Sequence, residues 1–176
     1  MEFKEIITGT EDIYSGRVFD VKKNTVKLIN GQEVTREQII HHGGVGILAL
    51  DPDGMVFMVR QYRSGVGIVT LEIPAGKLEK GEDPYDAAMR ELREETGYKT
   101  DKLKSLGDCI PTPAYCSEVI HLYLADNLEF CGQDLDENEF LTVEKYPLDT
   151  LYQMIMNNEI TDSKSVIAIL KAKAML

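Results

Sequence analysis

Basic residues and cysteine are scarce in this chain of 176 residues, and each shortage narrows what the protein can do. Only 19 Lys and Arg stand against 30 Asp and Glu, which gives a formal net charge of −11. That acidic excess argues against a nucleic-acid groove or an anionic membrane surface as a partner. A small anionic substrate stays open, because a metal ion and a few arginines can reverse the field locally. The three cysteines, Cys109, Cys116 and Cys131, are odd in number and lack CxxC spacing, so we expect neither a disulfide framework nor a zinc knuckle.

Long apolar runs are also missing. No hydrophobic stretch approaches the length of about 18 residues that suggests a membrane span, and residues 1–5 carry no apolar signal region. We therefore expect a cytoplasmic protein with no membrane contact. The composition, with 43% hydrophobic and 28% charged residues, is typical of a soluble globular chain. The length suits one domain with a substantial core, or a core with a small appendage.

Hydrophobic alternation and turn signals predict strands and helices in a mixed order. Strands are expected at 17–21, 24–29, 33–40, 45–50, 55–63, 102–109 and 119–125, with Asn30-Gly31 as a hairpin turn. Helices are expected at 149–157 and 163–174, the second beginning after Asp162. In that second helix the residues expected to face inward are Val166, Ile169 and Leu170. This order implies an α/β sandwich around a mixed sheet.

Another helix is predicted at residues 84–96, inside the most informative segment of the chain. Asp83 can cap its first turn, Pro84 suits the first helical position, and Gly97 suits the residue just past the end. The apolar residues at helical spacing, which predict a buried stripe, are Tyr85, Ala88, Met89 and Leu92.

Three carboxylates lie on the flank of this predicted stripe. Glu91, Glu94 and Glu95 fall within about 100° of one another around the helix, and like charges at this spacing repel. The carboxylates could form a solvated acidic face in which Arg90 pairs with Glu94. Alternatively, a bound cation could lie between them.

The spacing of the whole segment resembles the signature of the Nudix hydrolases, which cleave nucleoside diphosphates linked to another group. All seven fixed positions match over 23 residues, namely Gly76, Glu82, Arg90, Glu91, Glu94, Glu95 and Gly97. Tyr98 stands where the family usually has an aliphatic residue. The resemblance implies a Nudix α/β/α sandwich with a central mixed sheet.

The same resemblance implies a site for Mg²⁺, with Mn²⁺ as a possible substitute. Glu91 and Glu95 would be direct ligands, Glu94 would bind directly or through water, and Ala75 would add its backbone carbonyl. Mg²⁺ prefers oxygen ligands of this kind, and a polyanionic pyrophosphate needs its charge neutralised before attack. Arg90 would brace the loop and the helix.

Further segments resemble the ADP-ribose pyrophosphatase branch of that family, so the resemblance covers nearly the whole chain. They are Arg60–Arg63, Leu71–Lys77, His41–Val45 and Pro113, which lies sixteen residues past Gly97. In that branch the segment before the His-containing motif forms an antiparallel sheet that helps to make a domain-swapped homodimer. We therefore expect residues 1–40 to form an N-terminal dimerisation sheet and residues 41–176 to form the Nudix hydrolase domain.

Substrate contacts follow from the same resemblance. Arg63 would face a phosphate, where guanidinium geometry suits paired oxygens. The alternative is a strand arginine whose head reaches solvent. The loop that touches the terminal ribose and a phosphate is matched by Pro113, Ala114 and Glu118, although Ala114-Tyr115 replaces the family's frequent glycines.

Two further residues match a pair that reaches the adenine side of the substrate across the dimer. These are Arg36 and Glu37. A plain salt bridge at a strand edge is at least as good an interpretation.

The acidic loop at residues 134–140 is the remaining candidate. It is too short, and lacks the central glycine, for a calcium-binding EF-hand. In the ADP-ribose branch a late loop of this composition supplies the carboxylate that deprotonates the attacking water. Glu137 matches that role, Glu139 could help at the metal, and Glu94 is the other candidate catalytic carboxylate. A base must come within hydrogen-bond reach of its water, so we expect this loop to close on the substrate.

The resemblance therefore predicts a Mg²⁺-dependent ADP-ribose pyrophosphatase that produces AMP and ribose 5-phosphate. One alternative is another Nudix specificity, for an ADP-sugar or GDP-mannose. A second is a non-catalytic Nudix-fold regulator that binds a ligand. Such a regulator is expected to lack some of the metal carboxylates, and this chain retains them all.

Overall fold

The computed structural model describes residues 3–135, 137 and 140–176, and the chain divides into two compact units. The first unit runs to Gly43 and includes Ile110–Val119, and the second comprises Gly44–Cys109 and Ile120–Leu176. Compared with the expected division into 1–40 and 41–176, the boundary lies at Gly43, and residues 110–119 cluster with the N-terminal sheet. None of the helices in the described part of the chain has the length and apolar character that a membrane crossing needs.

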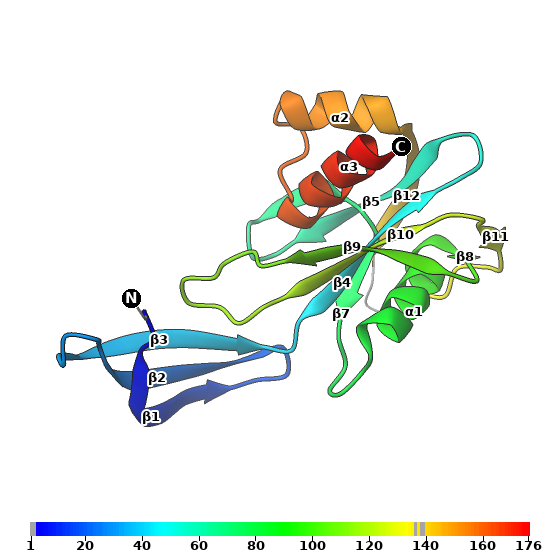
Figure 1. The fold of residues 1–176 in the computed structure, drawn as a ribbon. Helices are drawn as coiled ribbons and strands as arrows, with labels where there is room; N and C mark the ends of the chain where they lie inside the picture. The colour runs from blue at the N-terminus through cyan, green and yellow to red at the C-terminus, as the bar shows by residue number, and fades with distance from the viewer. Residues whose placement is uncertain (1–2, 136, 138–139) are drawn as a thin grey trace. The chain divides into compact units, whose positions relative to one another are not determined.

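A three-stranded antiparallel sheet makes up most of the first unit, drawn in blue in Figure 1. Its strands are β1 (Ile6–Ser15), β2 (Phe19–Lys27) and β3 (Glu33–His41), in the order β1-β2-β3. The predicted division of β2 into two short strands is wrong, because residues 19–27 pair continuously with β3. Strand β1 was not predicted. All of its residues are exposed, so its strand structure depends on pairing with β2.

A segment far away in the sequence completes the first unit. Ile39 of β3 donates its N–H to the carbonyl of Tyr115 at 2.7 Å, and Ser117 donates its N–H to the carbonyl of Ile39 at 2.9 Å. The backbone N–H of His41 donates to the hydroxyl oxygen of Ser117 at 2.9 Å. These bonds hold the predicted loop around Pro113 against β3.

A seven-stranded mixed sheet forms the centre of the second unit. Its main path has the order β12-β5-β4-β10-β9, in which β4 and β10 are parallel and the other neighbours are antiparallel. The strands are β4 (Gly44–Leu50), β5 (Met55–Arg63), β9 (Leu103–Cys109), β10 (Ile120–Ala125) and β12 (Leu141–Pro147). Two more strands join this path, β6 (Ile68–Glu72) beside β5 and β7 (Ala75–Lys77) beside β4. A separate pair is formed by β8 (Tyr98–Lys99) and β11 (Glu129–Phe130).

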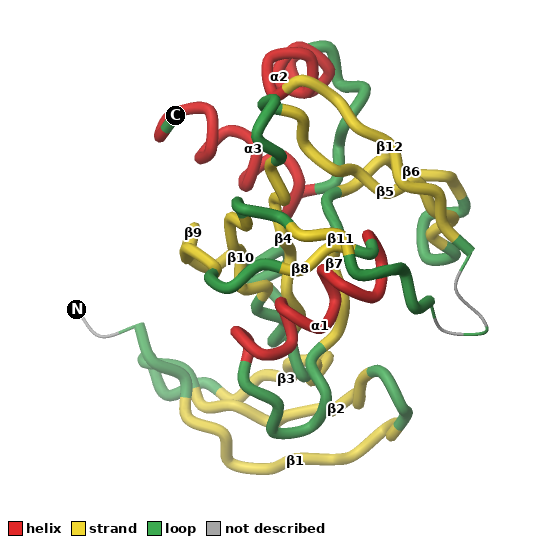
Figure 2. The backbone as a smooth tube through the Cα atoms, turned by 90° about the vertical axis from the view of Figure 1, so that its right-hand side faces the viewer, coloured by secondary structure: helices red, strands yellow, loops and turns green. Residues whose placement is uncertain are grey.

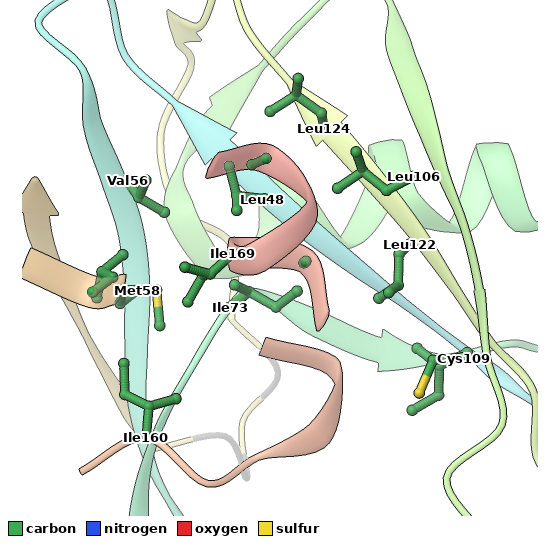
Figure 3. Close-up of a cluster of buried hydrophobic side chains, with 14 of the residues drawn as sticks. Leu48, Val56, Met58, Ile73, Leu106, Cys109, Leu122, Leu124, Ile160 and Ile169 are labelled. Carbon is green, nitrogen blue, oxygen red and sulfur yellow. The ribbon is translucent and has the colours of Figure 1, made fainter. Parts of the chain in front are cut away.

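Helices cover both faces of this sheet, so the predicted α/β/α sandwich is confirmed. The helix α1 (Pro84–Thr96) lies on one face, and α2 (Leu148–Met156) and α3 (Ser163–Met175) lie on the other (Figure 2). Alternation along β4 explains the two cores. Ile47 packs in the cluster that includes Leu92 of α1, whereas Leu48 packs in the cluster that includes Ile169 of α3 (Figure 3).

The inward face of α3 differs in part from the prediction. Ile169 is fully buried as expected, but Leu170 is 37% exposed, so its predicted inward position is wrong. The residues that face the sheet follow the i, i+3, i+4, i+7 pattern and are Ser165, Ala168, Ile169 and Ala172. Leu170 lies about 100° away from Ile169 around the helix and therefore turns out of this stripe.

Candidate functional site

The helix α1 begins and ends where its sequence predicts. The side chain of Asp83 accepts a hydrogen bond from the backbone N–H of Tyr85 at 2.8 Å, and Pro84 is the first helical residue. Gly97 adopts φ 76° and donates its N–H to the carbonyl of Arg93 at 2.9 Å. A residue with a Cβ adopts such a φ only with strain. Because both ends are fixed, the angular positions of the carboxylates on α1 are fixed as well.

Arg90 lies at the centre of the acidic cluster on α1. Its Nη1 donates to Glu91 at 2.7 Å and to Glu94 at 2.9 Å. Its Nε and Nη2 bind both oxygens of Glu82, at 3.0 Å and 3.1 Å. The bonds to Glu82 are the largest cause that raises the pKa of Arg90 above its ordinary value, and they also hold the pKa of Glu82 below its own. Arg90 therefore relieves the repulsion among these carboxylates and ties the loop before α1 to the helix.

Gly76 is required by its contact with Glu91. A Cβ built on Gly76 would lie 1.9 Å from the carboxyl carbon of Glu91. The backbone of β7 thus runs directly against this carboxylate. Gly44 is under a similar restriction, because its Cβ would lie 2.8 Å from the carbonyl oxygen of Gly76. Gly76 leaves the space into which Glu91 fits, and Gly44 leaves the space for the carbonyl of Gly76.

Glu95 connects α1 to the same strand. Its side chain is buried, and its Oε2 accepts a hydrogen bond from the backbone N–H of Ala75 at 2.9 Å. The structure therefore brings three of the predicted metal-binding residues, Ala75, Glu91 and Glu95, to the contact between α1 and β7.

The groups at this contact fit a hard divalent cation. The carboxylates of Glu91, Glu94 and Glu95 and the carbonyl of Ala75 offer only oxygen donors, which Mg²⁺ and similar ions prefer. Among the described residues, these carboxylates do not form a group of three or more that is placed to hold a metal ion. Arg90 binds two of the carboxylates, and the N–H of Ala75 binds the third.

Arg63 contacts a carboxylate that the sequence analysis did not single out. Its Nε and Nη2 donate to the two oxygens of Glu72 at 2.9 Å and 2.6 Å. Lys164 and the hydroxyl of Thr70 also bind Glu72. Glu95 is among the charges that raise the pKa of Arg63, after the larger effect of Glu72, so the guanidinium lies within the field of the α1 carboxylates.

The buried network around Glu72 makes a prediction about acid stability. Burial acts to raise the pKa of Glu72, but the bonds from Arg63, Lys164 and Thr70 outweigh it and lower this pKa to about 2 from an ordinary value of 4.5. The network therefore stabilises the fold fully above pH 4.5, and this stabilisation is lost as the pH falls toward 2. We expect Glu72→Gln to reduce the free energy of unfolding by on the order of 3 kcal/mol at neutral pH and by progressively less below pH 4.5.

Urea unfolding of both proteins between pH 7 and pH 3 measures this difference. The subtraction of the two curves removes the contributions of other carboxylates, such as Glu82, whose pKa is also lowered. A difference that stays constant across this pH range would contradict the assigned network.

The loop that leads to the predicted base is bound to the end of α1. Cys131 donates its N–H to the carbonyl of Gly97 at 2.8 Å, and Asp134 donates its N–H to the carbonyl of Glu94 at 3.2 Å. The side chain of Gln133 donates to the carbonyl of Glu95 at 2.6 Å. Glu137 is exposed and lies three residues after Asp134 in the chain. Its role as a base stays a prediction, and Glu139 lies outside the described residues.

The other predicted substrate contacts lie in the first unit. A groove of about 400 Å³ brings four of them together. Its lining includes Arg36, Glu37, Pro113 and Ala114.

Arg36 and Glu118 each have a charged or titratable partner within the first unit. Arg36 pairs with Glu5 at 2.7 Å and 3.2 Å, which is the kind of salt bridge that the alternative interpretation of Arg36 expected. The carboxylate of Glu118 lies 3.7 Å from Nδ1 of His41. The roles of these residues in substrate binding stay predictions.

Sequence reasoning missed Glu72 and Lys164. One signal was available for Glu72, because a single carboxylate between Leu71 and Ile73 in an apolar stretch predicts a buried charge that needs a partner. Lys164 has no such local signal, since it lies 92 residues away from Glu72 in the chain.

Comparisons with known proteins agree with this geometry. The NUDIX domain family matches residues 40–167 of the chain. The chain is 43% identical to a methanol dehydrogenase activator of Bacillus methanolicus, over 95% of this chain and 91% of that protein. It is 39% identical to an ADP-ribose pyrophosphatase of Bacillus subtilis, over 94% and 91%, and 33% identical to one of Mycobacterium tuberculosis, over 95% and 82%. The crystal structure of an ADP compounds hydrolase matches with a TM-score of 0.85 at 24% identity, covering 98% of this chain and 94% of that one, which shows the same fold.

Proposed function

Because the chain belongs to the NUDIX domain family, we propose that it hydrolyses the pyrophosphate bond of ADP-ribose to AMP and ribose 5-phosphate. The observation that carries this proposal is the set of carboxylates on α1, of which Glu91 and Glu95 lie against β7 and Glu94 is bound by Arg90. Glu91 fits only because Gly76 has no side chain, and Glu95 binds the backbone of Ala75. Two relatives that match more than nine-tenths of this chain are named ADP-ribose pyrophosphatases.

A divalent cation, Mg²⁺ or Mn²⁺, belongs to this proposal. Glu91, Glu94, Glu95 and the carbonyl of Ala75 would hold it. The ion would neutralise pyrophosphate charge and lower the pKa of a bound water. Arg90 would keep the carboxylates ordered, since its guanidinium binds Glu91 and Glu94.

The chemistry also needs a base and a way to fix the substrate. Glu137 would accept the proton of the attacking water, supported by the bonds that attach its loop to α1. Arg63 would bind a phosphate, supported by its exposed side chain, which is 40% accessible, and by the nearby field of Glu95. Arg36 and Glu37 would contact the adenosine side, and Pro113, Ala114 and Glu118 the ribose side.

A homodimer is the proposed assembly, with the first unit as its dimerisation sheet. The described chain exposes several large apolar side chains on this sheet, and exposed apolar patches mark interaction surfaces. Those on β1 and β2 are Ile6, Ile7, Ile13, Tyr14 and Phe19. We also place the protein in the cytoplasm, away from nucleic acid and membrane surfaces. Its free cysteines fit a reducing compartment, and its net charge of −11 disfavours polyanionic partners.

Hydrolysis of ADP-ribose, ADP-glucose, NADH and GDP-mannose, each with and without Mg²⁺, tests the proposal. We expect ADP-ribose to be cleaved fastest, with release of AMP only when the metal is present. Faster cleavage of another substrate would assign a different Nudix specificity. If no substrate is cleaved, the non-catalytic regulator becomes the better interpretation.

Replacing Glu137 with Gln separates proton transfer from metal binding. We expect kcat for ADP-ribose to fall about 100-fold, because a positioned base contributes on the order of 10²–10⁴ in rate. The Mg²⁺ concentration that gives half-maximal activity should stay nearly the same. The matched control is Glu129→Gln, which changes another exposed carboxylate between β10 and β12. A wild-type rate for Glu137→Gln would overturn the assignment of the base.

A second candidate function comes from the relative named a methanol dehydrogenase activator, at 43% identity. A chain with that role would raise the turnover of a methanol dehydrogenase when the two are mixed. Adding the wild-type protein and an inactive metal-site variant to such an enzyme distinguishes the possibilities. Activation by the wild type alone would show that hydrolysis is part of the effect, and activation by both would favour the regulator.

A further inference from the structure

The carboxylate of Glu72, at the end of β6, is shared by two cations. Arg63 donates to both of its oxygens, and Lys164 contacts Oε2. Thr70 adds a bond to Oε1 at 2.5 Å. The side chain of Glu72 is only 2% exposed. Two cations therefore contact this one buried carboxylate, although Lys164 also contacts a second carboxylate, Asp162.

The two cations are held very differently. The side chain of Lys164 is 9% exposed and lies between Glu72 and Asp162, whose Oδ1 is 3.0 Å from Nζ. Asp162 is also the N-cap of α3 and accepts bonds from Ser165. Lys164 is therefore fixed by the start of a helix.

Arg63 has more freedom. It is the last residue of β5, its side chain is 40% exposed, and a turn at residues 64–67 follows it. The charge of Glu95 acts on its guanidinium. Arg63 thus combines a partly exposed side chain with a partner, Glu72, that lies three residues before Ala75, whose N–H binds Glu95 of α1. A pyrophosphate would bind beside these α1 carboxylates under the proposed function.

We propose that Lys164 is a positioning residue, the permanent counter-ion of Glu72, which allows Arg63 to leave this carboxylate and bind a phosphate of the substrate. Removing the partner of a buried charge is costly because it leaves that charge uncompensated. With Lys164 and Thr70 in place, Glu72 keeps a cation and a hydrogen bond when Arg63 turns away. Without Lys164, Arg63 would be the sole cation on Glu72 among these contacts and would be held there. This inference rests on the proposed hydrolysis of ADP-ribose.

The variant Lys164→Met removes the charge and keeps most of the side-chain volume. We expect its KM for ADP-ribose to rise about tenfold with kcat changed less than about twofold, because weaker binding of ground state and transition state alike affects KM. Lys164→Arg should restore the wild-type KM. Binding of the non-hydrolysable methylene analogue of ADP-ribose, measured by calorimetry with Mg²⁺, should weaken in parallel.

A double-mutant cycle shows whether the effect passes through Arg63. Arg63→Met should raise KM by itself, and Arg63→Met with Lys164→Met should raise it no further. Effects that multiply in the double variant would overturn the proposal, since Lys164 would then act independently of Arg63. An unchanged KM in folded Lys164→Met, or no rescue by Lys164→Arg, would also overturn it.

If Lys164→Met fails to fold, the background Glu72→Gln carries the test. The neutral amide introduced by Glu72→Gln has no charge to retain Arg63, so adding Lys164→Met to this background should leave KM unchanged. A rise in KM there would overturn the proposal. If the wild type binds the methylene analogue but does not cleave ADP-ribose, the proposed function fails alone, because the calorimetric comparisons still report on Lys164. A protein that neither binds nor cleaves would overturn both.

Discussion

Replacing Glu95 with Gln is expected to lower kcat for ADP-ribose by more than about 100-fold, because even the partners of metal ligands are worth about 10–100-fold in affinity or activity. The carboxylate of Glu95 is buried and faces the backbone of Ala75, where the metal would bind. A Gln oxygen can still accept the N–H of Ala75, so the helix should keep its place. What the variant loses is a negative charge at the metal, and its half-maximal Mg²⁺ concentration should rise strongly.

Asp86→Asn is the matched control for this variant. Asp86 is an exposed carboxylate in the first turn of the same helix. Its replacement removes the same charge far from the proposed metal site, and the rate and metal dependence should stay near those of the wild type. Steady-state kinetics over a range of Mg²⁺ concentrations measure both variants. A Glu95→Gln enzyme with wild-type kinetics would mean that the metal is held elsewhere or is not needed.

Gly76→Ala is expected to reduce activity about 100-fold, because a misplacement of about 1 Å in a catalytic group has an effect of that size. The new methyl group would lie 1.9 Å from the carboxyl carbon of Glu91 and 2.3 Å from its Oε2. The end of a flexible side chain can move aside, so the carboxylate should be displaced while the fold survives. We expect the free energy of unfolding to fall by only about 1–3 kcal/mol, as is usual for an overpacked site.

Gly65→Ala provides the comparison for the glycine variant. A Cβ built on Gly65 meets nothing within 4 Å. This second substitution should therefore leave both kcat and stability nearly unchanged. Kinetics together with urea unfolding distinguish the two effects at Gly76. If Gly76→Ala loses stability and activity in proportion, with no folded and inactive population, its role is in the fold and not in placing Glu91.

The parts of the fold that could be predicted are those with local signals. The ends of α1 follow from Asp83, Pro84 and Gly97, whose effects depend only on their immediate neighbours. The helices predicted at 149–157 and 163–174 were found at Leu148–Met156 and Ser163–Met175. The first begins directly after Pro147, and the second begins after its N-cap Asp162.

The elements that were missed depend on distant partners. Strand β1 has no buried residue, and its backbone bonds are made to β2. Strand β6 begins at Ile68 directly after a turn that contains Gly65 and Gly67, its first two residues are exposed, and it pairs with β5. Alternating burial is the signal that sequence reasoning uses, and neither strand offers enough of it.

The residues of the candidate site also fall into those that local sequence predicts and those that depend on distant partners. The carboxylates of α1 could be predicted because they lie within one helix at fixed angles. The network that holds Glu72 could not, since Lys164 and Arg63 reach it from α3 and β5. Arg90 shows an intermediate case. Its pairing with Glu94 is a helical spacing effect, but its two bonds to Glu82 depend on how the preceding loop folds back.

The attachment of the loop at residues 131–134 to the end of α1 limits how this protein can vary. The bonds from Cys131, Gly132 and Asp134 are donated by backbone N–H groups, which every amino acid except proline provides. These backbone bonds do not depend on the side chain of Asp134, whereas Gly132 adopts φ 93° and the side chain of Gln133 binds the carbonyl of Glu95, so these two positions are restricted. The number of residues from there to Glu137 is restricted as well. A single insertion or deletion would alter how far the Glu137 carboxylate extends from α1. The length of this segment is therefore more constrained than the identity of most of its side chains.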